Sequence, residues 1–331
     1  MEIHFTFSGI VFAIIKLLLL AFAGYVLRHR NIIDDKFTDT LSSVLVKLIF
    51  PVLIIYKTVS NFSFIDFPLW WVLPLAAVIF SLTGMVLGSL VFSGFLDKKA
   101  PLDPITGKRK TKREFIASCG FQNSGYLPMN IILFAFSGLA GDVLLVYTFL
   151  FLTGFNLLIW SFLPLFFERK GRREMNFSSL FNPPVVATIV SLIWVWLFGK
   201  GSIPQVIADP MGQLGQASFP IAMLVLGAYL SSHKAHLPER KILVVAGMIT
   251  KLIIFPALVL AVIAAIPMNT GYRFFLFVEA IMPSAVTLVV VGSYSKADNG
   301  YLSSIIFYSH IAAIFTIPLW LGIFRMLIPG V

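Results

Sequence analysis

Ten apolar segments follow one another along this 331-residue chain, with short polar connections between them. They lie at about 7–27, 38–59, 67–95, 115–136, 142–167, 183–198, 213–231, 242–266, 274–294 and 301–324. Each is close to the roughly 20 residues that an α-helix needs to cross the hydrocarbon core of a bilayer. Hydrophobic residues make up 58% of the chain and charged residues only 12%, which excludes an ordinary soluble fold. The sequence therefore predicts an all-α, polytopic membrane protein with ten transmembrane helices in a lipid bilayer.

The distribution of Lys and Arg predicts how the chain is oriented. Alternate connections hold most of these bases, including the clusters at 28–36, 96–114 and 169–173. The other connections hold only Lys57, Lys200, Arg273 and Arg325. Because Lys and Arg are retained on the cytoplasmic side, both termini are predicted to lie outside the cytoplasm, with the chain spanning the cell (inner) membrane.

The net charge of +10 does not indicate a nucleic-acid partner. The densest basic stretch, 107–113, has no interleaved aromatic residues and lacks the first glycine of a phosphate loop, so we interpret it as a cytoplasmic membrane anchor. The single cysteine, Cys119, excludes an intrachain disulfide and is interpreted as a small packing residue. His233 and His236 have metal-like spacing, but Lys234 lies between them in a short connection, and both are predicted to be solvated. No cofactor or metal site is expected.

Two of the apolar segments are interrupted near their centres. The first, 115–136, is broken by small and polar residues and by a proline: Gly120, Gln122, Asn123, Ser124, Gly125 and Pro128. Because these residues work against an unbroken helix, we predict that it opens at about 123–128. The second, 274–293, has Pro283 and Ser284 at its centre. Broken helices at corresponding places in the two halves of a chain are typical of a transporter's substrate site.

The ten segments divide into two halves of five, at residues 1–168 and 169–331. An odd number of spans in each half makes the second half run opposite to the first, so the halves are predicted to be inverted repeats. The sequence FPVL at 50–53 is echoed by FPIA at 219–222, in the segment that the repeat makes equivalent. Most of the support for the repeat comes from this topology rather than from the matching letters.

Several ionisable and polar residues lie inside the apolar segments. Glu279 is the one acid that we place within a predicted span, and a carboxylate there needs a cation, a proton or a lysine partner. Lys47 and Lys251 each lie roughly 15 Å from the cytoplasmic ends of their spans. They are interpreted either as counter-charges, for an anionic substrate or for Glu279, or as structural anchors that face a polar cleft. His310 and Asn156 are predicted to be hydrogen-bonded interior residues.

Several short motifs, taken in order along the whole chain, resemble those of the auxin efflux carrier family, in its branch of bacterial organic-anion permeases. The motifs are GFQNSG at 120–125 with Pro128, NPP at 182–184, LG at 214–215 with Pro220 and LGA at 226–228, VEAIMP at 278–283 running to Tyr294, and IPL at 317–319. Each motif is short, but their order and spacing together are specific.

The resemblance implies a fold of two inverted five-helix repeats in which the broken helices, spans 4 and 9, cross at mid-membrane. It also implies a scaffold formed by spans 1, 2, 6 and 7 and a moving core formed by spans 3–5 and 8–10. The family's asparagine falls on Asn123, and its crossing prolines fall on Pro128 and Pro283. Glu279 stands where plant carriers have a glutamine. It is similar to the sodium-binding glutamate of the related bile acid:sodium symporters, whose partner glutamine is replaced here by Pro283.

We therefore predict a secondary active transporter of a small organic anion, a carboxylate, that works by alternating access and is coupled to a gradient of Na⁺ or H⁺. The expected substrate-binding residues are Gln122, Asn123, Ser124, Gly125, Pro128, Pro283 and Ser284, and the expected ion-coupling residues are Glu279, Gln122 and Asn123. Two alternatives stay open: an uncoupled electrogenic anion uniporter in which Lys47 or Lys251 neutralises Glu279, and a membrane receptor or scaffold without transport. No His-Glu-x-x-His motif, membrane aspartate pair or serine elbow indicates an enzyme. The expected partners are the anion and the lipid bilayer, and a homodimer is the one oligomeric state that we consider.

Overall fold

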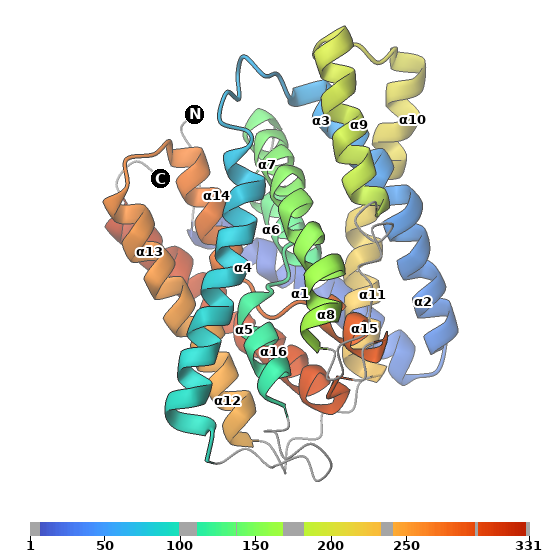
Figure 1. The fold of residues 1–331 in the computed structure, drawn as a ribbon. Helices are drawn as coiled ribbons and strands as arrows, with labels where there is room; N and C mark the ends of the chain where they lie inside the picture. Colours follow the sequence, from blue (N-terminus) through green and yellow to red (C-terminus); the bar gives the residue numbers. More distant parts are fainter. Residues whose placement is uncertain are drawn as a thin grey trace. The chain divides into compact units, whose positions relative to one another are not determined.

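The computed structural model describes residues 7–98, 111–136, 138–167, 182–232, 241–294 and 297–328 (Figure 1). Over these residues the chain is all α-helical, with a few π-helical turns and one isolated β-bridge, which confirms the predicted class. Six of the described helical segments are long and apolar enough to cross a membrane: Asp35–Asn61, Val72–Leu96, Ala140–Phe167, Gln205–Ser231, Lys241–Ala265 and Asn299–Leu327. The total of ten spans stays a prediction.

Some of the sequence interpretations fall outside the described residues. These are the first part of the basic stretch at 107–113 and the histidines His233 and His236. The membrane anchor and the solvated histidines therefore stay predictions.

The contacts divide the chain into two compact units. The first unit comprises Met1–Ala76, Gly125–Asn156 and Ser178–Ser232, and the second comprises Ala77–Ser124, Leu157–Phe177 and His233–Val331. Both units draw on each half of the sequence. The predicted repeats at 1–168 and 169–331 are defined by symmetry, and the predicted scaffold and core are defined by their motion. Contacts within one structure test neither, so both stay predictions.

The first unit is built from eight helices or parts of helices in the described residues. They are α1 (Phe7–His29), α2 (Asp35–Val44), α3 (Phe50–Asn61), α6 (Tyr126–Ala135), nearly all of α7 (Gly138–Leu157), α9 (Pro183–Phe198), α10 (Gln205–Gln216) and α11 (Ser218–Ser232). Within this unit α1 packs against α11, and α3 packs against α9 and α10 (Figure 1). The predicted start of α9 is confirmed, because the Asn182 side chain accepts a hydrogen bond from the backbone of Val185 at 3.1 Å.

Two glycines let α1 and α11 approach backbone to backbone. A Cβ atom added at Gly24 would lie 2.1 Å from the carbonyl oxygen of Leu224, and one added at Gly227 would lie 1.8 Å from the carbonyl oxygen of Ala21. Both distances are far inside van der Waals contact, so neither position has space for a side chain. Small residues at such crossings are how membrane helices gain close packing without a hydrophobic driving force.

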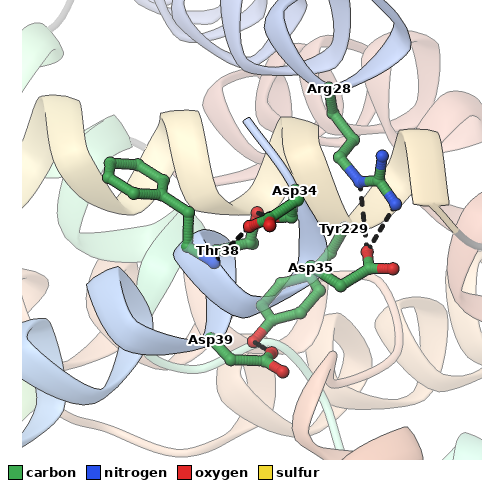
Figure 2. A network of polar contacts seen from close by, with 7 residues as sticks. Arg28, Asp34, Asp35, Thr38, Asp39 and Tyr229 are labelled. Carbon is green, nitrogen blue, oxygen red and sulfur yellow. Dashed lines mark hydrogen bonds and ion pairs between the residues drawn. The ribbon is translucent and has the colours of Figure 1, made fainter. Parts of the chain in front are cut away.

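A polar network fastens the turn between α1 and α2 to α11 (Figure 2). Asp34 caps α2 by accepting a hydrogen bond from the backbone of Phe37 at 2.7 Å, and Arg28 Nη2 pairs with Asp35 Oδ1 at 2.8 Å. The hydroxyl of Tyr229, on α11, donates to Asp39 Oδ1 at 3.0 Å. The network therefore holds three helices of the first unit together at this end.

The second unit carries the breaks predicted from the sequence. Its helices are most of α4 (Val72–Val91), α5 (Lys112–Gly120), α8 (Leu163–Phe167), α12 (Lys241–Ile249), α13 (Phe255–Ala265), α14 (Thr270–Ala280), α15 (Thr287–Tyr294) and α16 (Asn299–Leu327). Asp298 caps α16 by accepting from the backbone of Tyr301 at 3.2 Å, while its own N–H donates to Glu114 Oε1 at 2.9 Å. Because Glu114 lies on α5, this contact fixes the start of α16 beside α5.

Candidate functional site

Both apolar segments that the sequence predicted to be interrupted are broken in the structure. Helix α5 ends at Gly120 and α6 begins at Tyr126, and α14 ends at Ala280 while α15 begins at Thr287. The first break lies at 121–125, slightly before the predicted position at 123–128. Pro128 is therefore inside the first turn of α6, where a missing N–H costs nothing because that turn has no helical acceptor for it.

Within the second unit, the two breaks bond to each other through their backbones. The N–H of Asn123 donates to the carbonyl of Pro283 at 2.8 Å, and the N–H of Ala285 donates to the carbonyl of Phe121 at 2.9 Å. Gln122 and Ser284 thereby form an antiparallel bridge. Backbone N–H and C=O groups away from water must form hydrogen bonds inside the protein. Here each break supplies a hydrogen-bond donor and an acceptor to the backbone of the other. This pairing holds the side chains of the two breaks at one place.

Asn123 is oriented by a histidine that the sequence reasoning did not include in the site. Its Nδ2 lies 3.0 Å from His310 Nε2, and His310 Nδ1 lies 2.8 Å from the carbonyl oxygen of Ile306. Since a carbonyl only accepts, Nδ1 carries the proton, and the neutral ring then accepts from Asn123 at Nε2. The prediction that His310 is a hydrogen-bonded interior residue is confirmed, and its added role is to position Asn123.

Replacing His310 by Leu is expected to raise the KM of transport, because the Asn123 amide loses the acceptor that orients it. His310→Gln retains an acceptor and should leave KM closer to the wild-type value. Measuring initial uptake rates over a range of substrate concentrations separates this effect from lower protein stability, which would reduce the maximal rate and the melting temperature instead. Equal KM values for His310→Leu and the wild type would show that His310 does not position the site.

Glu279 is fully buried near the end of α14, beside the first break. The Ser124 hydroxyl and the Gln122 amide are the polar groups that lie beside its carboxyl group. Both Glu279 oxygens, both polar atoms of the Gln122 amide and the Ser124 oxygen are without a hydrogen-bond partner among the described residues. Buried polar atoms almost always have partners, so this cluster has the chemistry of a site that takes a ligand.

Lys251 belongs to the same unit and lies on a π-helical turn, Thr250–Ile254, between α12 and α13. The turn precedes Pro256, which has no N–H to donate to the carbonyl of Leu252, four residues earlier. Trp320 Nε1 donates to that carbonyl instead, at 2.7 Å. The Lys251 side chain is fully buried, with Nζ 4.3 Å from the centroid of the Phe255 ring. The lysine therefore sits where the helix is locally widened by the proline.

Replacing Trp320 by Phe is expected to destabilise the protein by about 1–3 kcal/mol, because the Leu252 carbonyl is left buried without a donor. The matched control is Trp196→Phe, since 73% of Trp196 is exposed. Thermal denaturation in detergent should show a lower melting temperature for Trp320→Phe than for the control. Equal melting temperatures would mean that the Leu252 carbonyl has another partner.

The structure brings most of the predicted site residues together, and it assigns the others to the first unit. Gln122, Asn123, Ser124, Pro283, Ser284, Glu279 and Lys251 all belong to the second unit. Gly125 directly precedes α6, Pro128 is buried in the first turn of α6, and Lys47 is exposed on a π-helical turn, Leu45–Ile49. These three belong to the first unit, and their part in a site stays a prediction.

The long apolar helices place the chain among multi-pass membrane proteins. The family described as "Membrane transport protein" matches residues 9–179 and 172–321, and the chain belongs to this family, that of the auxin efflux carriers. The predicted family is thereby confirmed, and it indicates transport rather than catalysis.

Three relatives illustrate the range of the family. An "Uncharacterized transporter" of Methanothermobacter thermautotrophicus is 28% identical over 323 residues, which cover 95% of this chain and 98% of the relative. The "Uncharacterized transporter MJ1031" of Methanocaldococcus jannaschii is 25% identical over 316 residues, 93% of this chain and 96% of the relative. "Protein PIN-LIKES 7" of Arabidopsis thaliana is 22% identical over 158 residues, 44% of this chain and 40% of the relative. None of these names gives a substrate.

Proposed function

We propose that this protein is a secondary active transporter of a small organic anion, a carboxylate, as in the organic-anion permease branch of its family. The observation that carries the proposal is the cluster of unpartnered polar atoms on Gln122, Ser124 and Glu279, buried where two chain breaks bond to each other. Polar atoms in that state bind a ligand, an ion or water, and broken helices are where membrane transporters bind their substrates. Alternating access would move this place between the two sides of the membrane.

The hydrogen bonds already made decide which groups remain for an anion. Ser284 donates its hydroxyl proton to the carbonyl of Ser118 at 2.8 Å, and the Asn123 amide donates to His310. The donors without any hydrogen bond are the Gln122 amide and the Ser124 hydroxyl, and Asn123 Nδ2 has a second N–H besides the one that His310 accepts. The start of α15, which follows Pro283 and Ser284, adds the partial positive charge of a helix N-terminus. Gly125 and Pro128, which lie at the start of α6, also remain proposed substrate-binding residues.

Glu279 is the proposed binding group for the coupling cation. Its carboxylate oxygens, with the oxygens of Gln122 and Ser124 beside them, are the hard ligands that Na⁺ prefers, and the carboxylate can equally take a proton. Asn123 belongs to the proposed set through its position in the same break. The resemblance of Glu279 to the glutamate of the bile acid:sodium symporters supports this assignment.

The proposed topology has ten spans in two inverted repeats, with both termini outside the cytoplasm. The six long helical segments give six spans, α1 and α9 give two more, and each broken pair, α5 with α6 and α14 with α15, is counted as one. The distribution of Lys and Arg supports the orientation in the cell membrane.

A thermal-shift screen of the purified protein, followed by uptake into proteoliposomes, tests the function. Small carboxylates are expected to raise the melting temperature, more so with Na⁺ or at lower pH, and the stabilising compounds should be taken up saturably. Uptake that ignores both cation gradients would favour the uniporter. Binding without any flux would favour a receptor and overturn the proposal.

A further inference from the structure

Glu279 and Lys251 are an acid and a base buried in the second unit, and neither makes a hydrogen bond to the other. Both side chains have an exposed fraction of 0%. They lie close enough to interact electrostatically. Neither the Lys251 nitrogen nor the two Glu279 oxygens have a hydrogen-bond partner among the described residues. Attraction between charges is strong away from water, and an uncompensated buried charge is costly. A purely structural pair would be expected to close to hydrogen-bonding distance, whereas this one is open.

The surroundings of the two charges differ in kind. Oxygen-bearing side chains, those of Ser124 and Gln122, lie beside the Glu279 carboxylate. The Lys251 ammonium lies over the ring of Phe255 and interacts with the buried thiol of Cys119. The carboxylate thus has the neighbours that suit a small cation, and the ammonium has apolar neighbours that suit a carboxylate with a short hydrocarbon body.

Resting on the transport function proposed above, we propose that Glu279 and Lys251 bind the coupling cation and the substrate carboxylate at the same time, one ligand on each charge. The substrate is then a monocarboxylate, because Lys251 is the one cationic group that the proposal assigns to it. In this proposal the empty site has no net charge, whether the acid and the base are both ionised or both neutral, and the loaded site adds one positive and one negative charge. One monovalent cation therefore accompanies one monocarboxylate, and transport is electroneutral.

The proposal predicts different losses for the two single variants. Glu279→Gln keeps the lysine, so the empty site is positive, the loaded site is neutral, and one negative charge crosses in each cycle. An imposed potential of ~100 mV should then change the accumulation of the anion by about 50-fold, whereas it should not affect the wild type. Lys251→Met should raise the KM for the anion at least ~10-fold while Na⁺ or H⁺ still stabilises the protein, because one lost charge-assisted hydrogen bond is worth about 1.5–3 kcal/mol. Lys251→Arg keeps the charge and should restore binding.

The experiment reconstitutes the wild type, both single variants, Lys251→Arg and the double variant Glu279→Gln/Lys251→Met in liposomes. Uptake of radiolabelled lactate is measured at equal pH on both sides, with the potential set by potassium and valinomycin. The double variant should lose both cation dependence and saturable lactate uptake. If it instead transports like the wild type, or if Lys251→Met keeps the wild-type KM, the pair is structural and the inference is wrong.

A wild type whose lactate accumulation follows the imposed potential would also overturn the inference, while leaving transport itself established. Failure of the proposed function looks different, because the wild type would then take up neither lactate nor any other small carboxylate. Size-exclusion profiles and melting temperatures of the variants separate loss of function from loss of folding.

Discussion

Glu279→Gln is expected to abolish the accumulation of substrate that an inward cation gradient drives, while leaving equilibration of the substrate across the membrane. The amide has nearly the same shape as the carboxylate but binds neither Na⁺ nor a proton with comparable strength. With one cation coupled per substrate and the potential clamped at zero, a tenfold gradient provides about 1.4 kcal/mol, enough for up to about tenfold accumulation by the wild type. The accumulation ratio of the variant should fall to about one.

The matched control for this prediction is Glu114→Gln, which makes the same change at another buried acid of the second unit. Glu114 accepts a hydrogen bond from the backbone of Asp298 and lies at the start of α5 rather than at the breaks. The control should be less stable than the wild type and still accumulate substrate. Gradient-driven accumulation by Glu279→Gln would remove Glu279 from the coupling mechanism.

Gly227→Val is expected to prevent stable packing of α1 against α11. The first atom of the new side chain would lie 1.8 Å from the carbonyl oxygen of Ala21, which is backbone and cannot rotate away. Overpacking typically costs about 1–3 kcal/mol, and a clash with backbone is expected to reach the upper end of that range or exceed it, because the two helices must move apart. The protein should show a much lower melting temperature and aggregate during size-exclusion chromatography.

Gly94→Ala is the control for Gly227→Val, since a Cβ at Gly94 meets nothing within 4 Å. It should purify and unfold like the wild type. A Gly227→Val variant with wild-type stability would show that α1 and α11 do not meet at Gly227 in the folded protein.

The breaks could be predicted from the sequence because their causes are local. Gly120, Asn123 and Pro283 disfavour a continuous helix wherever they occur, so the interruption of both segments followed from composition. The first opening begins slightly before the position that the sequence predicts. Proline marks the region of a break, but it is tolerated in the first turn of the helix that follows, and Pro128 occupies that turn.

The site was only partly predictable, because its members lie far apart along the chain. Gln122, Glu279 and Lys251 can be selected from the sequence because they are polar residues in apolar segments, where burying them is costly unless they bind a partner. No local pattern connects Asn123 with His310, which is 187 residues away, and their contact follows from the way α16 is held beside α5. Lone polar residues in spans can be selected from sequence, but their pairing depends on the tertiary structure.

The π-helical turns were not predicted, although their signal is visible in the sequence. Lys47 is followed by Leu-Ile-Phe-Pro, and Lys251 is followed by Leu-Ile-Ile-Phe-Pro. In both places the turn ends directly before the Phe-Pro pair, where a helix loses one backbone donor. Trp320, which replaces that donor at Leu252, is distant in sequence. The proline indicates that a carbonyl will be left without its helical partner, but not which side chain will supply the hydrogen.

The antiparallel bridge between Gln122 and Ser284 has a mechanical consequence. The backbone hydrogen bonds of Asn123 and Ala285 join residues 121–123 to residues 283–285 within the second unit, so these two short stretches are expected to move together. The residues proposed to bind the anion and those proposed to bind the cation, such as Gln122, Asn123 and Ser284, would then move together. Binding of the cation and of the anion would then be coupled directly, because the paired residues 121–123 and 283–285 would move both ligands in one step.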